Sequence, residues 1–390
     1  MITILEGDCC ERLAEIPDGT FHCCVTSPPY WGLRSYLPDG HPDKDEELGL
    51  EPTPDLYVAN LVDVFRKVRR VLRDDGVAWV NLGDSYAANR GNGASSVGDK
   101  QATNAGSLLG KLTCPDRLKP KDLVGIPWRV AFALQADGWW LRSDVIWHKP
   151  NCMPESVTDR PTKAHEYLFL LSKSARYFWD QDAVREDFAD DRQGCDGSSR
   201  PRERNRGGRT DGYTKPNGID PSSNGGRNIR SVWTIPTYPY SEAHFATFPP
   251  ALVEPCIKAG TSERGCCPEC GAPWERVVEK EFIPQEDVSL ERGIKGAAGQ
   301  KPMDAMSGWD GVPRGSNRTT TTGWRPTCDH DADPIPCRCL DPFGGAGTVG
   351  LVADRLGRDA TLVELNAEYC EMAEQRVRGD APLFVDVIVD

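Results

Sequence analysis

The sequence predicts an α/β fold with a central sheet, and three observations lead to that prediction. Apolar runs at 21–26 and 77–82 are strand candidates, and an amphipathic stretch at 55–72 separates them. Residues 338–356 combine a strand, a glycine-rich turn and a helix, an arrangement found at cofactor sites of α/β sheets. No run approaches the roughly 18 apolar residues of a membrane span. Alternating strands and helices are typical of α/β sheets.

Two short strands and a helix are expected at the start of the chain. Ile2–Leu5 is apolar and ends at Gly7-Asp8, and Phe21–Thr26 ends abruptly at two prolines. The stretch 55–72 is predicted to be a helix, because four apolar side chains recur on one of its faces. These side chains are Leu61, Phe65, Val68 and Leu72.

The middle of the chain continues the alternation after a break at Asp74-Asp75-Gly76. Residues 85–119 are rich in Gly, Ser, Asn and Ala and are interpreted as a long loop. A helix is expected over 123–136, with Pro127 near its first turn. The runs that indicate strands in this part are 77–82, 139–147 and 167–171.

The C-terminal part has the same strand and helix pattern. Arg338–Asp341 and Ala360–Leu365 are expected to be strands. Thr348–Leu356 and Ala367–Val377 are expected to be helices, the second of them capped by Asn366.

The charge is unevenly distributed. A net charge of −13 by itself argues against a nucleic-acid ligand, since phosphate binding favours a basic surface. The segment from Arg192 to Arg230, however, contains nine Lys and Arg and four Asp and Glu, an excess of five positive charges. It also contains eight glycines. We interpret this segment as a flexible basic loop, with a solvated insertion that binds nothing as the alternative. The N-terminus lacks a signal-peptide pattern, so a protein of the cytoplasm of a bacterium or bacteriophage-infected cell is expected.

Residues 341–348 read Asp-Pro-Phe-Gly-Gly-Ala-Gly-Thr and connect a strand to a helix. Glycines let the backbone turn tightly and approach a ligand, and the helix N-terminus offers N–H groups to a carboxylate or phosphate. Glu364 ends the next strand, 23 residues after Asp341, where α/β cofactor sites place an acid against ribose hydroxyls. The spacing differs from the dinucleotide motif, and a purely structural turn is the alternative.

A second motif, Thr26-Ser27-Pro28-Pro29-Tyr30-Trp31, follows the second strand. The prolines fix an extended turn and remove two N–H donors. Acceptors remain on the Ser27 hydroxyl and on the carbonyls of Ser27 and Pro28, while Tyr30 and Trp31 supply flat faces. Such an edge suits a planar ligand with an NH₂ group, and a rigid loop is the alternative reading.

Taken together, the two motifs resemble those of the amino-group DNA methyltransferases, D/S/N-P-P-Y/F/W for catalysis and D-P-F-x-G-x-G-T for the cofactor. Their order here resembles the circularly permuted β class of that family. The resemblance spans about residues 1–180, 231–260 and 334–390. It implies a Rossmann-like methyltransferase fold with a mixed central sheet, S-adenosyl-L-methionine as methyl donor and double-stranded DNA as substrate.

The resemblance also assigns residues to the site. The catalytic ones are Ser27, Pro28, Pro29 and Tyr30. Asp8 resembles the acid that contacts the cofactor's adenosine part, and the segment 244–249 resembles the one that packs over its methionine part. The expected cofactor-binding residues are Asp8, Thr247, Phe248, Asp341, Pro342, Phe343, Gly344, Gly345, Gly347, Thr348, Glu364 and Asn366.

The resemblance, together with the cysteine pairs between 267 and 330, divides the chain into five segments. They are a catalytic half at 1–180, a basic Gly-rich target-recognition loop at 181–230, a cofactor-packing segment at 231–264, a zinc-ribbon-like insertion at 265–333, and at 334–390 the cofactor-binding half of the same methyltransferase domain.

The mechanism implied by the family is direct methyl transfer to a flipped-out base. Tyr30 stacks on the base, and the amino hydrogens bond to the Ser27 hydroxyl and the Pro28 carbonyl, which aims the nitrogen lone pair at the sulfonium methyl. Serine in the first position resembles the cytosine-N4 subgroup. Adenine-N6 stays open, because the same edge could hold its amino group.

Carbon-5 methylation of cytosine would need a cysteine nucleophile after a proline. Pro255-Cys256 and Pro336-Cys337 have that sequence, but they lack the context that the carbon-5 family uses, and its motif order is reversed.

Fifteen cysteines in a chain of the cytoplasm indicate metal ligation or burial more than disulfides. A C-x₂-C pair and a later C-x-H pair suit a tetrahedral structural Zn²⁺, which would give the polar segment 271–327 a reason to fold. The predicted ligands are Cys267, Cys270, Cys328 and His330. Alternative ligands are Cys266, Cys337 and Cys339, the last expected to be buried in its strand. Free cysteines without metal are the other alternative.

The motifs disfavour two other functions. A non-catalytic, zinc-containing nucleic-acid-binding module has no use for Gly344, Gly347 and Glu364 together. Glutamine methyltransferases use Asn-Pro-Pro-Tyr, but their cofactor motif comes first. No membrane partner is expected. The sequence leaves open the recognised DNA site, a cognate restriction endonuclease and the oligomeric state.

Overall fold

The computed structural model describes residues 1–33, 35, 37, 44, 47–87, 118–186, 227–238, 247–284, 315–381 and 386–390. These fall into two compact units. The larger one comprises Met1–Ala183, Arg230–Glu275 and Pro326–Asp390, and the smaller one Val184–Ile229 and Arg276–Arg325. Most of the predicted loop at 85–119 and of the basic segment 181–230 lies outside the described residues.

The larger unit is built on a mixed sheet, as predicted. Its described strands have the order β11-β1-β10-β9-β2-β3-β5-β4-β6. Strand β5 is antiparallel to both β3 and β4, and the other neighbours run parallel. The strands are β1 (Ile2–Glu6), β2 (Phe21–Thr26), β3 (Leu72–Leu82), β4 (Trp140–His148), β5 (His165–Ser172), β6 (Val232–Thr234), β9 (Arg338–Asp341), β10 (Asp359–Glu364) and β11 (Val387–Val389).

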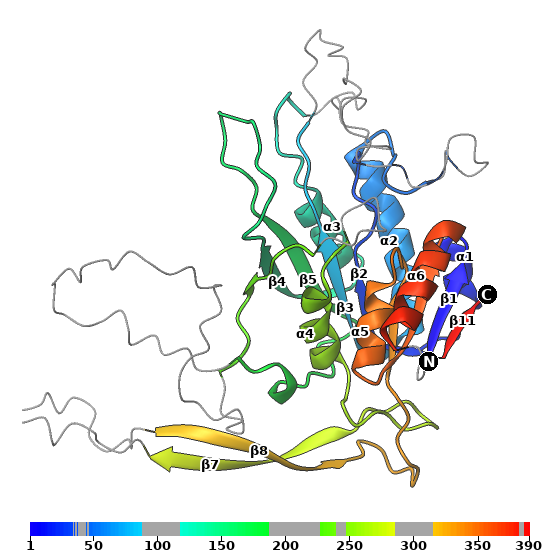
Figure 1. Cartoon of the computed structure of the whole chain (residues 1–390), viewed down its shortest axis with the longest axis vertical. Coiled ribbons are helices and arrows are strands. Elements are labelled where there is room, and N and C mark those ends of the chain that lie inside the picture. Colours follow the sequence, from blue (N-terminus) through cyan, green and yellow to red (C-terminus); the bar gives the residue numbers. More distant parts are fainter. Residues whose placement is uncertain are drawn as a thin grey trace, which may run out of the picture. The chain divides into compact units, whose positions relative to one another are not determined.

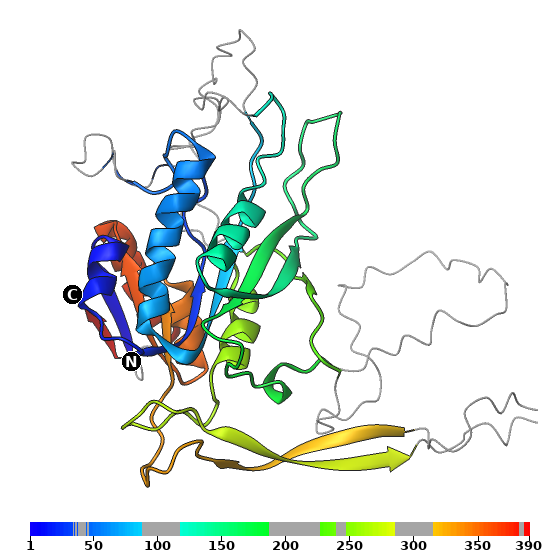
Figure 2. The ribbon, with the colours of Figure 1, turned by 180° about the vertical axis from the view of Figure 1, so that it is seen from behind.

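Helices cover both faces of this sheet. Figure 1 shows α4 (Pro250–Gly260), α5 (Thr348–Arg355) and α6 (Ala367–Asp380) in front of it. Figure 2, from behind, shows α1 (Cys9–Glu15), α2 (Pro54–Val71) and α3 (Ile126–Ala136) on the other face. The main core lies under α1–α3, where α2 buries the apolar face that its periodicity predicts. In the described part of the chain, no helix is both long and apolar enough to cross a membrane.

The smaller unit contains a two-stranded sheet of β7 (Glu275–Pro284) and β8 (Gly315–Arg325). The Arg276 guanidinium lies 4.4 Å from the ring centroid of Trp324, and its Nη1 donates to Thr321 Oγ1 at 3.3 Å. Sequence patterning did not indicate these strands, because the polar, threonine-rich run of β8 carries no apolar alternation. A short 3₁₀ helix, Asp182–Val184, lies where the two units join along the chain.

Several predicted bounds are wrong for local reasons. Asp74, Asp75 and Gly76 do not separate α2 from β3. They lie within β3, in an irregularity of its pairing with β2. Helix α3 begins three residues later than predicted, because Gly125 adopts a φ of 77° and Asp84 Oδ1 accepts hydrogen bonds from the Gly125 and Ile126 amides. Helices α1 and α4 and strand β11 were not predicted.

The sheet has one functionally important edge. The parallel strands β1, β10, β9, β2 and β3 all end there. Because β5 runs the opposite way, its first residues, His165 and Glu166, reach the same edge. Polar residues that follow the parallel strands are therefore gathered along one line, as expected for α/β cofactor sites.

Candidate active site

The structure brings the two predicted motifs together. Strands β2 and β9 are parallel neighbours, with Cys23 opposite Cys339 and Cys24 opposite Leu340. The last residue of β2, Thr26, donates its hydroxyl proton to Asp341 Oδ1 at 2.7 Å. The segments that follow these strands, which carry the Pro-Pro and the glycine motifs, therefore leave the sheet side by side.

The glycine turn has the backbone conformation that only glycine adopts easily. Gly345 and Gly347 have φ values of 48° and 73°. A Cβ on Gly347 would lie 2.8 Å from the Cβ of Ala373, so the close approach of α5 to α6 also requires glycine here. No side chain caps α5, which leaves its first N–H groups for a bound anion.

Glu364 ties the glycine turn to the end of β10. Its Oε2 accepts from the Gly345 amide at 2.7 Å and its Oε1 from the Asn366 amide at 2.9 Å. Burial raises the pKa of this carboxyl. Each oxygen keeps a second lone pair, so the carboxylate can still accept from a hydroxyl of a ligand. Asn366 itself caps α6 by accepting from the Glu368 amide, as predicted.

Asp341 is completely buried, and desolvation raises its pKa to about 8. Its Oδ1 accepts from the Thr26 hydroxyl and from the Phe343 amide. Its Oδ2 is buried and has no hydrogen-bond partner among the described residues. A bound molecule with a polar group could satisfy this oxygen.

The other predicted cofactor residues occupy different positions. Asp8 follows β1 and caps α1 by accepting from the Cys10 and Glu11 amides. The Gly7 amide donates to the Glu364 carbonyl, so this turn lies beside the end of β10. Thr348 is buried, and its hydroxyl accepts from Arg376 Nη1 at 3.0 Å.

Thr247 and Phe248 precede Pro249, the N-cap of α4, and are half-buried. The residue that follows α4, Thr261, accepts a hydrogen bond from Arg358 Nε at 3.1 Å, and Arg358 directly precedes the start of β10. The helix therefore begins toward the opposite edge, where the motifs lie. His244–Ala246 of the same predicted segment lie outside the described residues.

The catalytic motif forms a polar edge with a residue that the sequence analysis missed, Asn81 of β3. Tyr30 OH lies 3.0 Å from Asn81 Oδ1, and Ser27 Oγ lies 3.4 Å from the same atom. Asn81 Nδ2 donates to the Tyr167 carbonyl at 3.1 Å, which turns Oδ1 toward Ser27. The edge thus offers a hydroxyl and an amide oxygen at the end of two neighbouring strands.

The two prolines hold this edge in place. The Pro29 carbonyl accepts from the Tyr57 hydroxyl of α2 at 2.8 Å. No described residue donates to the Pro28 carbonyl. The expectation that Trp31 supplies a second flat face is wrong: it is only 3% exposed, and its Nε1 donates to the Glu51 carbonyl.

Tyr30 is positioned from two further sides. A Cβ on Gly83 would lie 2.4 Å from Tyr30 Cε2, so the ring needs glycine beside it. Tyr30 OH also lies 2.9 Å from Glu166 Oε2, and Glu166 Oε1 pairs with the Lys149 ammonium. Lys163 Nζ is buried without a hydrogen-bond partner among the described residues, and desolvation lowers its pKa. Sequence patterning gave no signal for Glu166, because only the antiparallel pairing of β5, of which it is the second residue, places it at this edge.

Comparison with known proteins agrees with this geometry. The family model described as DNA methylase (N6_N4_Mtase) matches residues 21–267 and 338–375. The chain belongs to this family. It is an enzyme, a DNA methyltransferase that uses S-adenosyl-L-methionine, and the predicted resemblance to the amino-group DNA methyltransferases is confirmed.

Known relatives are similar to this methyltransferase over nearly its whole length. The type II methyltransferase M.Cfr9I of Citrobacter freundii is 36% identical over 378 residues, 97% of this chain and 88% of the relative. M.SmaI of Serratia marcescens is 34% identical over 375 residues, 96% and 90% of the two chains. The solved PvuII DNA methyltransferase, described as cytosine-N4-specific, is similar over 99% of this chain and 86% of its own, with a TM-score of 0.52 and 16% identity. That likeness supports the methyltransferase fold.

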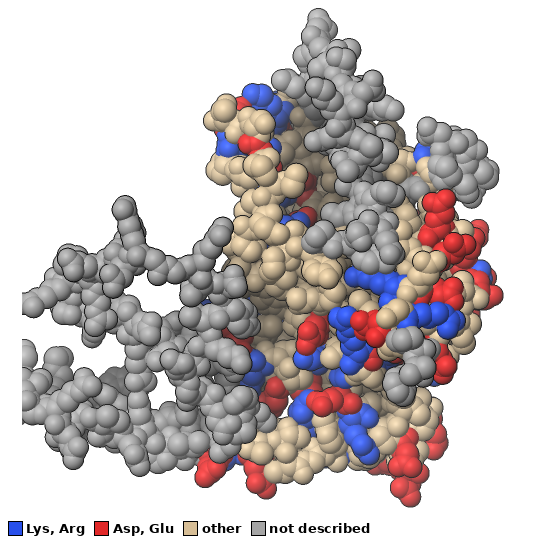
Figure 3. Space-filling view, viewed as in Figure 1, with Lys and Arg blue, Asp and Glu red and all other residues tan. Residues whose placement is uncertain are grey.

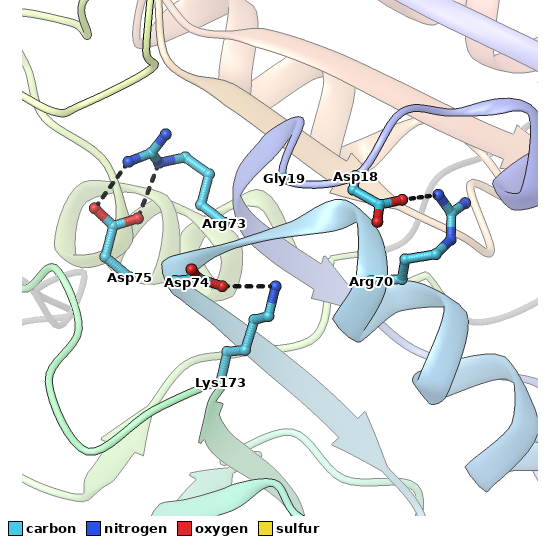
Figure 4. Close-up of a pocket in the computed structure, with 7 residues that line it drawn as sticks. All are labelled: Asp18, Gly19, Arg70, Arg73, Asp74, Asp75 and Lys173. Atoms are coloured by element: carbon cyan, nitrogen blue, oxygen red, sulfur yellow. Dashed lines mark hydrogen bonds and ion pairs between the residues drawn. The ribbon is translucent and has the colours of Figure 1, made fainter.

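One face of the methyltransferase is mixed in charge where it is described. On the face in Figure 3, basic and acidic side chains of the described residues lie next to one another. A pocket near the amino ends of β2 and β3 is lined by three ion pairs, Arg70 with Asp18, Arg73 with Asp75, and Lys173 with Asp74 (Figure 4). Since each cation there is paired with a carboxylate, this pocket does not offer a site for DNA phosphates.

Among the described residues, the cysteines contribute to three groups that could hold a metal ion, one of which is Asp8 with Cys9 and Cys10. The four predicted zinc ligands Cys267, Cys270, Cys328 and His330 come together. The alternatives Cys266 and Cys337 instead lie with His22 in a separate buried group, and Cys339 is buried in β9 as expected. All thirteen cysteines that the structure describes are free thiols.

Proposed function

We propose that this methyltransferase transfers the methyl group of S-adenosyl-L-methionine to the exocyclic N4 of cytosine in duplex DNA. The observation that carries the proposal is the contact of Thr26 with Asp341, because it joins the catalytic motif to the cofactor motif at one edge of the sheet. An amino group held by one motif would then face a methyl group held by the other.

On this proposal, the cofactor lies over the ends of β1, β10 and β9. The uncapped start of α5 would bind its carboxylate, and Glu364 would accept from the ribose hydroxyls. Asp8, at the neighbouring strand end, would face the adenosine part. Thr247 and Phe248, at the start of α4, would cover the methionine part. The buried Oδ2 of Asp341 would accept a hydrogen bond from the bound cofactor or an ordered water.

The flipped base would stack on Tyr30. Its amino hydrogens would be accepted by Ser27 Oγ and the Pro28 carbonyl, with Asn81 Oδ1 as a further acceptor beside Ser27. These acceptors do not remove a proton from the amino group. They orient the NH₂ group so that its lone pair points at the donor carbon, and the gain is mainly one of positioning.

The chemistry needs no covalent enzyme intermediate. The amino nitrogen forms a bond to the methyl carbon as the carbon–sulfur bond breaks, its electron pair stays on sulfur, and the nitrogen then loses one proton to solvent. The cysteines of the competing carbon-5 chemistry are unsuited to attack. Both Cys256 and Cys337 are buried, and their surroundings raise the pKa of each thiol.

Cytosine is favoured over adenine on two grounds. Serine stands first in the catalytic motif, as in the cytosine-N4 subgroup that the sequence resembles. The PvuII enzyme, which shares the fold, is itself described as cytosine-N4-specific. Adenine N6 is the alternative, since the family includes enzymes for both amino groups.

The remaining assignments belong to the same proposal. The basic loop at 181–230 would recognise the target sequence and supply positive charge for the phosphates. The similarity to type II methyltransferases suggests a cognate restriction endonuclease that cuts the unmethylated site.

The test is to express the chain in a host without DNA methylation and to sequence its DNA for modified bases. We expect N4-methylcytosine in one sequence context, and none with Ser27→Ala/Tyr30→Ala, although this variant should still bind the cofactor. N6-methyladenine would establish the alternative base. Unmodified DNA from a folded, cofactor-binding protein would contradict both assignments.

A further inference from the structure

We propose that Cys267, Cys270, Cys328 and His330 bind one structural Zn²⁺ at the edge of the sheet opposite the active site. Their four donor atoms all lie within 4.8 Å of one another, and Cys267 Sγ is 3.6 Å from His330 Nδ1. Zinc bonds of about 2.0–2.3 Å in a tetrahedron separate the donors by about 3.3–3.8 Å. A contraction of less than about 1.5 Å would therefore complete the coordination.

The donor set selects the metal. Three thiols and one imidazole are ligands for Zn²⁺, whereas Mg²⁺ and Ca²⁺ prefer oxygen and common iron–sulfur clusters use four thiolates. His330 turns Nδ1 toward the cysteines, while its Nε2 lies 3.6 Å from Glu269 Oε2. A carboxylate on the second ring nitrogen is a usual partner of metal-bound histidine, since it fixes the tautomer.

The backbone places the two ligand pairs face to face. The amides of Glu269 and Cys270 both point at Cys267 Sγ, and Gly271 makes the tight turn with a φ of 70°. The Cys266 amide donates to the Ile335 carbonyl, and the Ile335 amide donates back to Cys266, both within 2.9 Å. The chain before the first pair is thus held directly to the chain after the second.

The site is remote from the chemistry. The Gly271 carbonyl is 2.9 Å from His22 Nε2, and the Cys270 carbonyl accepts from Arg73 Nη1 at 2.6 Å. His22 and Arg73 are the second residues of β2 and β3, so the four ligands lie near the beginnings of these parallel strands. The catalytic motif lies beyond their ends. A metal here can hold the fold but cannot touch the base or the cofactor.

The neighbouring group of His22, Cys266 and Cys337 does not offer a second metal site. His22 Nδ1 accepts from the Arg338 amide at 3.1 Å, and Nε2 donates to the Gly271 carbonyl. Both ring nitrogens therefore have backbone partners, and Nε2 docks the turn after Cys270. One zinc per chain is therefore expected, with His22 acting as a support for the turn.

The metal would join the two ends of a long segment of the chain. Fifty-seven residues, 271–327, lie between Cys270 and Cys328, and they include all of β7 and β8 with little apolar content. Joining the two ends of such a segment through a metal lowers the conformational entropy of the segment between them. The assignment rests on the ligand geometry alone and stands whether or not the proposed methylation is correct.

The experiment compares the wild type with C270S and C152S in full-length protein. Cys270 is exposed, so serine removes a ligand without opening a cavity in the core. Cys152 is half-buried and lies outside all three groups of candidate ligands, which makes C152S the matched control. After dialysis against metal-free buffer, elemental analysis should give about one zinc per wild-type or C152S chain, and less than about a tenth in C270S.

Thermal unfolding then tests what the metal does. A strong chelator should lower the Tm of the wild type and of C152S by several degrees, to that of C270S, and added zinc should restore the first two only. Below these temperatures, methylation by C270S should stay within about threefold of wild type, because the ligands lie far from the catalytic edge. Wild-type protein without zinc, whether its thiols are free or paired in a disulfide, would overturn the proposal. A zinc content of C270S equal to that of the wild type would also overturn it. A folded C270S that binds cofactor but has lost methylation would overturn the structural role.

Discussion

The hydroxyl of Thr26 donates a 2.7 Å hydrogen bond to Oδ1 of Asp341, a residue 315 positions later in the chain. Both groups are buried, so Thr26→Val removes the hydroxyl proton but keeps the shape of the side chain. We expect a loss of about 1–3 kcal/mol in the free energy of unfolding, because a buried acceptor loses a donor. Cofactor affinity should fall with it, since Asp341 begins the glycine turn. Denaturant titration and equilibrium binding measure the two effects.

Thr26→Ser is the control for this variant, because it keeps the hydroxyl and removes only a methyl group. It should retain most of the cofactor affinity. If Thr26→Ser and Thr26→Val weaken cofactor binding equally, the hydrogen bond to Asp341 does not align the two motifs.

Gly83 leaves the space that the Tyr30 ring occupies. Alanine there would place a Cβ 2.4 Å from Tyr30 Cε2, so the ring must move. We expect Gly83→Ala to lower kcat by roughly 10–100-fold, the size of effect that a misplacement of about 1 Å can have, with cofactor affinity unchanged. Steady-state methylation with a DNA duplex and direct cofactor binding separate the two quantities.

Gly379 provides the matched control for Gly83, because a Cβ on this α6 residue would have no neighbour within 4 Å. Gly379→Ala should leave kcat unchanged. Unaltered kcat in Gly83→Ala would mean that the position of Tyr30 in the structure is not the one used in catalysis.

The parts of the site that could be predicted from sequence are those marked by an abrupt change of composition. The apolar runs of β2 and β9 end at Pro-Pro and at the glycine turn, and both strands have the bounds that the sequence indicated. Asn366 could be recognised as a helix cap for the same reason, because a short polar side chain precedes a helical pattern.

The residues that were missed depend on the order of the strands in space. Asn81 is the penultimate residue of an apolar strand, but its importance follows only from the parallel pairing of β3 with β2. Glu166 reaches the active edge because β5 runs antiparallel to β3, which no local pattern in the sequence indicates. Trp31 was misassigned because an aromatic residue beside a motif has the same local sequence whether it faces a ligand or the core.

Glu166 is expected to act through Tyr30 as a positioning residue. Its Oε2 lies 2.9 Å from Tyr30 OH, and Lys149 holds its other oxygen. Tyr30→Phe keeps the stacking ring and should lower kcat by roughly tenfold or less, whereas Tyr30→Ala should lower it far more. Glu166→Ala should match Tyr30→Phe, and the double variant should be no worse than either single one, since both remove the same contact. Additive losses in kcat would show that Glu166 acts independently of Tyr30.

Asp341 should make the stability of the cofactor-free enzyme depend on pH. Burial raises its pKa from the ordinary 3.8 to about 8, so between these values the folded chain holds a proton that the unfolded chain has lost. The stabilisation is therefore complete below about pH 4 and is progressively lost as the pH rises toward 8. Asp341→Asn removes this titration, so the difference in unfolding free energy, wild type minus variant, should fall steadily from pH 5.5 to 8. Asp386→Asn, which removes an exposed carboxylate, serves as the control for the loss of one negative charge. A difference for Asp341→Asn that stays constant over this range would mean that Asp341 is already ionised in the folded protein, and that its buried Oδ2 is paired in solution.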